Sequence, residues 1–265
     1  MTERYAVIGH PVAHSKSPLI HGEFARATGQ DIEYRRIEVA RDGFRRAAEE
    51  FRAAGGKGLN VTLPFKHEAF QYCGEPSPRA RAAEVVNTLA FRDPVFGDNT
   101  DGIGLVRDLE RNLHFDPRSG RALLMGAGGA AHGVIGALRE AGVAQLVIVN
   151  RTVAKAQALA ARFPRTRACG YEDLGEESFG LIINATSASL LDAAPPLPAS
   201  IFGRGALAYD MVYGRETPFL AAARGAGARV SDGLGMLVEQ AAESFFVWRG
   251  VRPDTAPVLR KLRGG

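Results

Sequence analysis

The sequence has few cysteines and no long run of apolar residues. Only two cysteines occur among its 265 residues, Cys73 and Cys169, and they lie far apart without a C-x-x-C pair. A disulfide-stapled scaffold and a thiolate zinc site are therefore not expected. The first residues lack a basic region followed by an apolar core, so no secretory leader is predicted. We expect a reduced, cytoplasmic setting and no membrane segment.

Charge of one sign is not concentrated anywhere, although the net charge is +4 and the isoelectric point is about 9.3. The arginines are spread along the chain, whereas nucleic-acid binding requires a basic stripe or patch. No nucleic-acid partner is therefore predicted. His10 and His14 are four residues apart, but Pro11 disfavours a helix at His10, so we expect no metal site there.

A glycine-rich segment follows an apolar run at residues 121–131. The run Arg121 to Met125 has the character of a buried strand, and the segment Gly126 to Ala131 then leads into a helical pattern. A strand, a glycine turn and a helix N-terminus together direct bare backbone N–H groups at one point, which suits a phosphate. The sequence therefore predicts a dinucleotide-binding domain that begins about 120 residues into the chain.

The end of the next predicted strand, 145–149, indicates which dinucleotide is bound. NAD-specific sites usually carry an acidic residue there for the ribose 2′-hydroxyl, whereas this chain has Asn150, Arg151 and Thr152. An arginine suits a 2′-phosphate, so NADP is the expected cofactor.

The order of expected elements predicts an α/β fold with two domains. Strands near 4–9, 32–39 and 58–63 alternate with helices from Ser17 and over 44–54, which favours a largely parallel sheet. A strand at 85–91 and a helix over 103–113 follow. Strands and helices alternate again from 121 to 225, and a final helix from Met236 places Leu237, Gln240 and Ser244 on one face. We expect residues 1–101 with 237–265 to form a substrate-binding and catalytic domain, residues 102–236 a Rossmann-type domain, and a cleft between the two.

Polar side chains follow several predicted strands of the first domain. Ligands of parallel sheets collect at the carboxyl ends of strands, so these side chains are candidate ligand contacts. Asn60 and Thr62 should share one face of their strand, with Leu59, Val61 and Leu63 packed on the other. Each residue also has a simpler interpretation: Ser17 is a suitable helix cap, Lys66 a surface charge and Asp101 a turn acid.

Lys66 and Asp101 are the candidate catalytic pair. Hydride transfer to a carbonyl needs a group that moves the hydroxyl proton and a group that stabilises the developing oxyanion. A lysine beside a carboxylate keeps its charge, which suits proton donation during reduction. The sequence leaves open which of the two carries the transferred proton.

The ordered set of motifs resembles the shikimate dehydrogenase family over nearly the whole chain. The motifs are the segments 13–18, 60–66, 86–88, 97–102, 126–131, 150–152, 184–187, 209–213 and 232–236. The resemblance implies reversible, NADPH-dependent reduction of 3-dehydroshikimate to shikimate, a step toward chorismate and the aromatic amino acids.

The resemblance also implies roles for individual residues. Lys66 and Asp101 match the catalytic pair, and the substrate-binding residues are matched by Ser15, Ser17, Asn60, Thr62, Asn87, Tyr213 and Gln240. The cofactor-binding residues are matched by Gly126, Ala127, Gly128, Gly129, Ala130, Asn150, Arg151, Thr152, Lys155, Thr186, Met211 and Gly233. No metal is implied, and a monomer or homodimer is expected.

Three positions depart from the family pattern, namely Pro78, Glu84 and Ser189. They put local loop geometry in doubt, and Ser189 replaces a common glycine near the cofactor. Two alternatives stay open: a quinate/shikimate or shikimate-like dehydrogenase with relaxed substrate or cofactor choice, and a non-catalytic NADP sensor.

Overall fold

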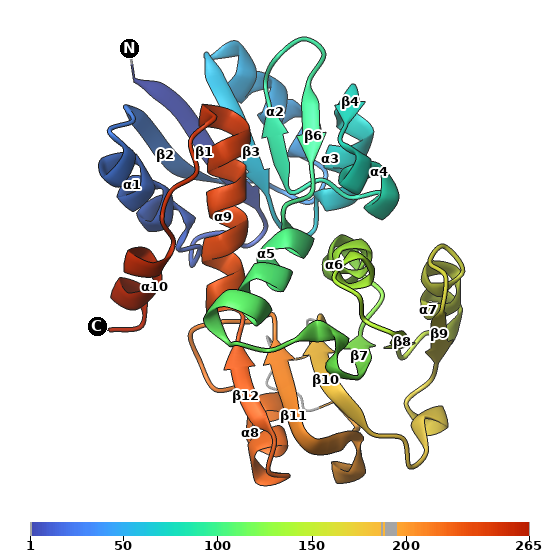
Figure 1. The fold of residues 1–265 in the computed structure, drawn as a ribbon. Coiled ribbons are helices and arrows are strands. Elements are labelled where there is room, and N and C mark those ends of the chain that lie inside the picture. The colour runs from blue at the N-terminus through green and yellow to red at the C-terminus, as the bar shows by residue number, and fades with distance from the viewer. Residues whose placement is uncertain (1, 187, 189–194, 265) are drawn as a thin grey trace. The chain divides into compact units, whose positions relative to one another are not determined.

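The structure is a computed structural model that describes residues 2–186, 188 and 195–264. It contains two compact units, Met1–Leu105 with Leu237–Gly265, and Val106–Met236. The chain leaves the first unit within helix α5 (Asp101–Arg107) and returns to it within helix α9 (Leu234–Arg249). Figure 1 shows the order of the elements along the chain. No helix in the described ranges is long and apolar enough to cross a membrane.

A six-stranded mixed sheet forms the centre of the first unit, in the order β2-β1-β3-β5-β6-β4. Strand β1 pairs in parallel with both β2 and β3, but β5 runs antiparallel to β3 and to β6. The expected strand at 85–91 is shorter than predicted and covers only Thr88–Ala90. The strands are β1 (Glu3–Gly9), β2 (Ile32–Glu38), β3 (Gly56–Val61), β4 (Glu75–Pro76), β5 (Thr88–Ala90) and β6 (Phe96–Asp98).

Helices cover both faces of this sheet. Helices α2 (Phe44–Ala53) and α3 (Lys66–Tyr72) pack on one face, where Phe44, Phe51 and Phe65 join Leu59 and Val61 in the core. Each such buried side chain contributes about 2 kcal/mol of burial free energy. Helices α1 (Ser17–Thr28) and α9 pack on the other face through aromatic rings. The remaining helices of this unit are α4 (Pro78–Ala83) and α10 (Ala256–Leu262).

Two local predictions about this unit were wrong. Ser17 does not cap helix α1: Lys16 occupies the N-cap without a side-chain bond, and Pro18 fills the first turn. The expected packing of Leu63 also fails, because β3 ends at Val61 and Leu63 is 46% exposed. Pro64 ends the strand early, so the alternation of side chains does not extend to Leu63.

The second unit is a doubly wound domain with six parallel strands in the order β12-β11-β10-β7-β8-β9. Counted along this unit the order is 3-2-1-4-5-6 read from the β9 edge, as in dinucleotide-binding domains. Strands β7 (Arg121–Met125), β8 (Gln145–Val149), β10 (Phe179–Asn184) and β11 (Phe202–Asp210) form its interior, and β9 (Thr166–Cys169) and β12 (Arg229–Asp232) its edges. Helices α6 (Gly129–Glu140), α7 (Val153–Ala160) and α8 (Pro218–Gly225) connect them, with short 3-10 helices at 117–119, 172–174 and 199–201.

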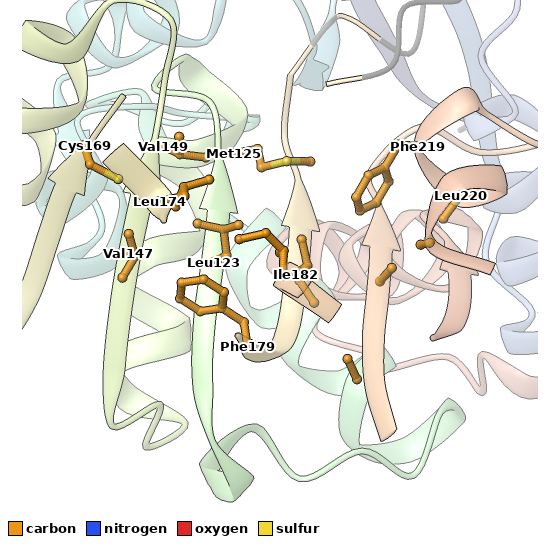
Figure 2. Close-up of a cluster of buried hydrophobic side chains, with 14 residues drawn as sticks. Leu123, Met125, Val147, Val149, Cys169, Leu174, Phe179, Ile182, Phe219 and Leu220 are labelled. Atoms are coloured by element: carbon orange, nitrogen blue, oxygen red, sulfur yellow. The ribbon is translucent and has the colours of Figure 1, made fainter. Parts of the chain in front are cut away.

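One layer of the core of the second unit lies on one face of its sheet, and the alternate residues on the other face are buried as well. Figure 2 shows Leu123, Met125, Val147, Val149 and Ile182 projecting into one apolar layer. These side chains come from three adjacent strands and alternate with residues of the opposite face. The layer fixes the plane of the sheet and thereby the positions of the loops at its carboxyl edge. The expected helix over 103–113 is two pieces, because α5 gives way to a π-helix at Asp108–Asn112.

Candidate active site

Lys66 and Asp101 form an ion pair in the first unit. Lys66 is the first residue of α3, and Asp101 is the first residue of α5. The Lys66 Nζ donates to Asp101 Oδ2 at 2.5 Å, and the two side chains are only 12% and 8% exposed. The structure therefore brings together two groups that are distant in sequence, in a place largely shielded from water.

Asn87 holds the other oxygen of the Asp101 carboxylate. Its Nδ2 lies 2.9 Å from Asp101 Oδ1, 2.9 Å from Thr100 Oγ1 and 3.1 Å from Gln240 Oε1. An amide nitrogen carries two hydrogens, so three acceptors compete for two bonds. The Asn87 oxygen accepts from the Thr100 backbone N–H at 2.8 Å, which fixes the orientation of the amide. A ligand oxygen can therefore replace one of these three acceptors, and both hydrogens of Asn87 Nδ2 still have a partner.

Asn60 is held by bonds within the unit. Its Nδ2 lies within 3.2 Å of the Asn87 carbonyl oxygen and Thr88 Oγ1, and 2.9 Å from Ser244 Oγ. Its oxygen accepts from the Tyr34 hydroxyl at 2.7 Å. Asn60 lies on the face opposite Leu59 and Val61, as the alternation predicted. Thr62 follows the end of β3 and is half-buried.

Ser15, in the loop after β1, and Ser17, the first residue of α1, present two buried hydroxyls. The Ser15 hydroxyl donates to Ser17 Oγ at 3.1 Å, and the residues are 7% and 5% exposed. Arg36 of β2 donates from Nε and Nη2 to the Ser15 carbonyl oxygen, at 2.9 and 2.5 Å. The loop conformation is therefore fixed from outside by an arginine that sequence reasoning did not single out.

A close helix contact places Gln240 of α9 beside helix α5, which begins at Asp101. A Cβ on Gly104 of α5 would lie 2.6 Å from the Cβ of Gln240 and 2.8 Å from its backbone nitrogen. Only glycine permits this approach. The same face of α9 carries Ser244, whose Oγ lies 2.8 Å from Thr88 Oγ1. The helical spacing of Gln240 and Ser244 predicted this shared face, but not the hydroxyl cluster that Ser244 completes.

A second charged group consists of the partly exposed Arg79 and the buried carboxylates of Asp98 and Glu243. Arg79 of α4 binds Asp98 through two hydrogen bonds of 2.8 and 2.6 Å, and its Nη2 also donates to Glu243 at 3.0 Å. The Asp98 side chain is 4% exposed and that of Glu243 is 7% exposed. Arg79 thereby ties the start of the loop that carries Asp101 to helix α9. Sequence reasoning missed this group, because nothing in the spacing of the three residues relates them.

The glycine-rich loop of the second unit has the geometry of a phosphate site. Gly126 follows β7 with a φ of 105°, a conformation that favours glycine, and Gly128 is the N-cap of α6. A Cβ on Gly126 would lie 3.2 Å from the Ala185 carbonyl oxygen, whereas the space beside Gly128 is open. Gly129 and Ala130 open the helix, and Ala127 is half-buried. The first N–H groups of α6 lack partners within the helix, so the loop fits a pyrophosphate.

Free positive charge lies at the end of β8. Arg151 and Lys155 are exposed, and neither forms an ion pair with any residue in the described ranges. Asn150 Nδ2 donates to the Thr152 carbonyl oxygen at 2.9 Å, which shapes the turn. No acidic residue occurs at 150–155. The donor set therefore suits a 2′-phosphate and not a free ribose hydroxyl.

The other expected cofactor residues lie at the carboxyl ends of β10, β11 and β12. Thr186 donates from its hydroxyl and its N–H to Asn184 Oδ1, at 2.7 and 3.1 Å. Met211 follows β11, and a Cβ on Gly233 would lie 2.4 Å from the Met211 carbonyl oxygen. Tyr213, expected among the substrate contacts, belongs to this second unit and is half-buried.

Two of the three positions that depart from the family pattern lie in helix α4 or at its end. Pro78 occupies the first turn of α4 behind Ser77, whose hydroxyl accepts from the Ala80 N–H, so proline fits there. Glu84 ends this helix at a φ of 55°, in the left-handed region that favours glycine. Ser189 lies outside the described residues.

Three family models match successive parts of the chain. The family model for the shikimate dehydrogenase substrate binding domain matches residues 7–89. The model for shikimate / quinate 5-dehydrogenase matches residues 109–191, and that for the shikimate 5′-dehydrogenase C-terminal domain matches residues 233–263. The chain belongs to the shikimate dehydrogenase family.

Individual relatives resemble the chain over nearly its whole length. The chain is 55% identical to the shikimate dehydrogenase (NADP(+)) of Methylobacillus flagellatus, over 98% of this chain and 99% of that protein. Among solved structures, the Ael1 enzyme from Pseudomonas putida is 51% identical with a TM-score of 0.92, over 98% of each chain. The shikimate 5-dehydrogenase from Thermus thermophilus in complex with NADP(H) and shikimate is 37% identical with a TM-score of 0.89, over 99% of each chain. Membership of the family confirms the fold class expected from the sequence.

Proposed function

We propose that this protein catalyses the reversible, NADPH-dependent reduction of 3-dehydroshikimate to shikimate. The observation that carries the proposal is the shielded Lys66–Asp101 ion pair, surrounded by amide and hydroxyl groups, in a chain that belongs to this family. A triol acid is best recognised by such short polar groups, because a missing substrate hydroxyl leaves a buried partner unpaired.

The Lys66 ammonium is the proton donor in the direction of reduction. NADPH, when bound, supplies the hydride to the carbonyl carbon. Lys66 Nζ donates a hydrogen bond to the carbonyl oxygen and transfers its proton as the alcohol forms, so the reaction consumes one hydride and one proton. Asp101 holds the lysine in place through Oδ2, and Asn87 keeps that carboxylate from rotating through Oδ1. In the oxidation of shikimate the same nitrogen, once deprotonated, accepts the hydroxyl proton.

The surrounding side chains bind the rest of the substrate. We assign the carboxylate to Ser15 and Ser17, and the ring hydroxyls to Asn60, Thr62, Asn87 and Gln240 together with the catalytic pair. Asn87 has one acceptor more than it has hydrogens, which allows exchange with a substrate hydroxyl. Asn60 binds by exchanging one of its three acceptors.

The second unit holds the cofactor in this proposal. Residues 126–130 receive the pyrophosphate at the N-terminus of α6, and Asn150, Arg151, Thr152 and Lys155 receive the 2′-phosphate. Thr186, Met211 and Gly233 lie at strand ends, where the nicotinamide half of a dinucleotide binds. We assign substrate binding to residues 1–101 with 237–265 and NADP binding to 102–236. We further propose a cytoplasmic protein that is a monomer or a homodimer.

The deciding experiment is a cofactor-coupled assay of the full chain. We expect rapid oxidation of NADPH with 3-dehydroshikimate, and weak activity with NADH. Replacing Lys66 by Met removes the proton donor with little change in side-chain length, so kcat falls by at least about 10³-fold while the Kd for NADPH changes less than about twofold. Unchanged turnover in Lys66→Met contradicts the assigned mechanism.

Quinate is the second candidate substrate, because one matching family model covers shikimate / quinate 5-dehydrogenases. Comparable kcat/KM for quinate and shikimate would establish the relaxed enzyme. Tight NADPH binding without turnover of either substrate would establish a non-catalytic sensor.

A further inference from the structure

Arg36 binds the loop that carries Ser15 and leads into Ser17, the first residue of α1. Its Nε and Nη2 both donate to one oxygen, the Ser15 carbonyl, at 2.9 and 2.5 Å. The guanidinium group is rigid, and two of its N–H groups donate to the same oxygen. These two bonds fix the arginine side chain as well as the loop. The guanidinium is therefore held against the backbone of a residue whose buried hydroxyl faces Ser17.

The charge of Arg36 is not neutralised by the protein. Arg36 forms no ion pair with any of the residues that the structure describes. Glu38, two residues along the same strand, is 3.8 Å from the His10 ring nitrogen instead. An arginine that is fixed by two hydrogen bonds and lacks a carboxylate is positioned to attract an anion.

Ser15 and Ser17 alone make a poor site for a carboxylate. Their hydroxyls are buried and neutral, and transfer of an ionised carboxylate out of water is costly unless a cation compensates it. The hydroxyls supply hydrogen bonds, whereas the charge has to come from a cation such as Arg36, which is exposed and bound to the Ser15 carbonyl oxygen.

We propose that Arg36 makes this site select an anionic substrate, by countering the substrate carboxylate from its position on the Ser15 carbonyl oxygen. The inference rests on the proposed function, because it places the substrate carboxylate at Ser15 and Ser17. It predicts that the contribution of Arg36 to catalysis depends on the charge of the substrate. If Arg36 had a purely structural role, its contribution would be the same for a charged and a neutral substrate.

The test compares shikimate with its neutral methyl ester in the NADP⁺-dependent oxidation catalysed by the full chain. In Arg36→Gln we expect kcat/KM for shikimate to fall at least about tenfold, mainly through KM, and that for the ester to change less than about threefold. Arg36→Lys keeps the charge and loses the fork, so its loss for shikimate should be smaller than that of Arg36→Gln. The matched control is Arg35→Gln: Arg35 is the neighbour on β2, lies 5.2 Å from the Phe51 ring centroid, and carries the same charge.

Losses of equal size for shikimate and for the ester in Arg36→Gln would overturn the proposal, as would an equal loss in Arg35→Gln. Calorimetric titration of wild type and Arg36→Gln with the two compounds measures the same ratio without turnover. Absence of turnover in the wild type, with carboxylate-selective binding that Arg36→Gln removes, would overturn the proposed function and support the role of Arg36.

Discussion

Protonation of His21 should make the protein lose stability in mild acid. His21 lies on α1, is fully buried, and stacks on Tyr34 with ring centroids 4.2 Å apart. Phe24, Phe245 and Trp248 close the cluster, and neither ring nitrogen of His21 has a hydrogen-bond partner among the described residues. Burial lowers the pKa of His21 from 6.5 to about 3, while the nearby Asn60 acts in the opposite direction. The imidazole is therefore neutral in the folded protein throughout the physiological range.

The sign of the effect follows from proton linkage. Well above pH 6.5 His21 is neutral in both the folded and the unfolded protein, so it makes no pH-dependent contribution. Below pH 6.5 the unfolded chain binds a proton that the folded protein excludes, so the free energy of unfolding falls until the pH reaches about 3. At about 1.4 kcal/mol per pH unit, the loss at a pH of about 5 is about 2 kcal/mol. That amount is a large fraction of the stability of an ordinary domain.

Urea unfolding near neutral pH and at a pH of about 5 measures this contribution. The free energy of unfolding of the wild type should fall by about 2 kcal/mol more than that of His21→Phe, which keeps the ring stacking and cannot bind a proton. If phenylalanine is too large for the cluster, the smaller variant His21→Leu replaces it in the comparison. The control is His14→Asn, at an exposed histidine, whose free energy of unfolding should depend on pH as that of the wild type does. Equal pH dependence in the wild type and both His21 variants would refute the reasoning.

Two further predictions concern the ionic groups of each unit. Arg79→Met should leave the Asp98 carboxylate without its cation and lower the free energy of unfolding by about 3 kcal/mol. This value is at the low end for breaking a buried ion pair, because the Arg79 side chain is 32% exposed. Denaturant titration measures this loss, and Arg79→Met combined with Asp98→Asn should recover part of it. Arg151→Ala should raise the KM for NADPH at least about tenfold and change that for NADH less than about twofold, as measured by initial rates; equal changes would place the 2′-phosphate elsewhere.

The sequence predicts the second unit more accurately than the first. Its interior strands are continuous apolar runs between helical patterns, so the ends of β7 and β8 were predicted to the residue. Strands β9 and β12 were not predicted, since edge strands such as Thr166–Cys169 are short and half-exposed and lack that apolar character. In the first unit, Thr88–Ala90 runs antiparallel because the chain reverses direction, and the pairing partners that fix this are distant in sequence.

The candidate site divides in the same way. Motif spacing and strand ends predicted Lys66, Asp101 and Asn87 as site residues, because proton transfer and substrate binding each need a particular residue type at a strand end. The arginines that hold neighbouring segments, Arg79 on Asp98 and Arg36 on the Ser15 carbonyl oxygen, look like ordinary surface arginines in the sequence. Their role depends on which carbonyl or carboxylate the fold brings within hydrogen-bond distance, and local patterns contain no such information.

One local conflict in the sequence does point to function. Lys66 is the first residue of α3, where the positive end of the helix dipole disfavours a cation, whereas Asp101 at the first residue of α5 is favoured. A sequence optimised for stability alone would avoid a lysine at that position. The Asp101 carboxylate offsets the conflict at 2.5 Å, and Asn87 fixes that carboxylate from its other side. The carboxylate therefore holds the ammonium in a fixed position at a helix terminus that would otherwise repel it.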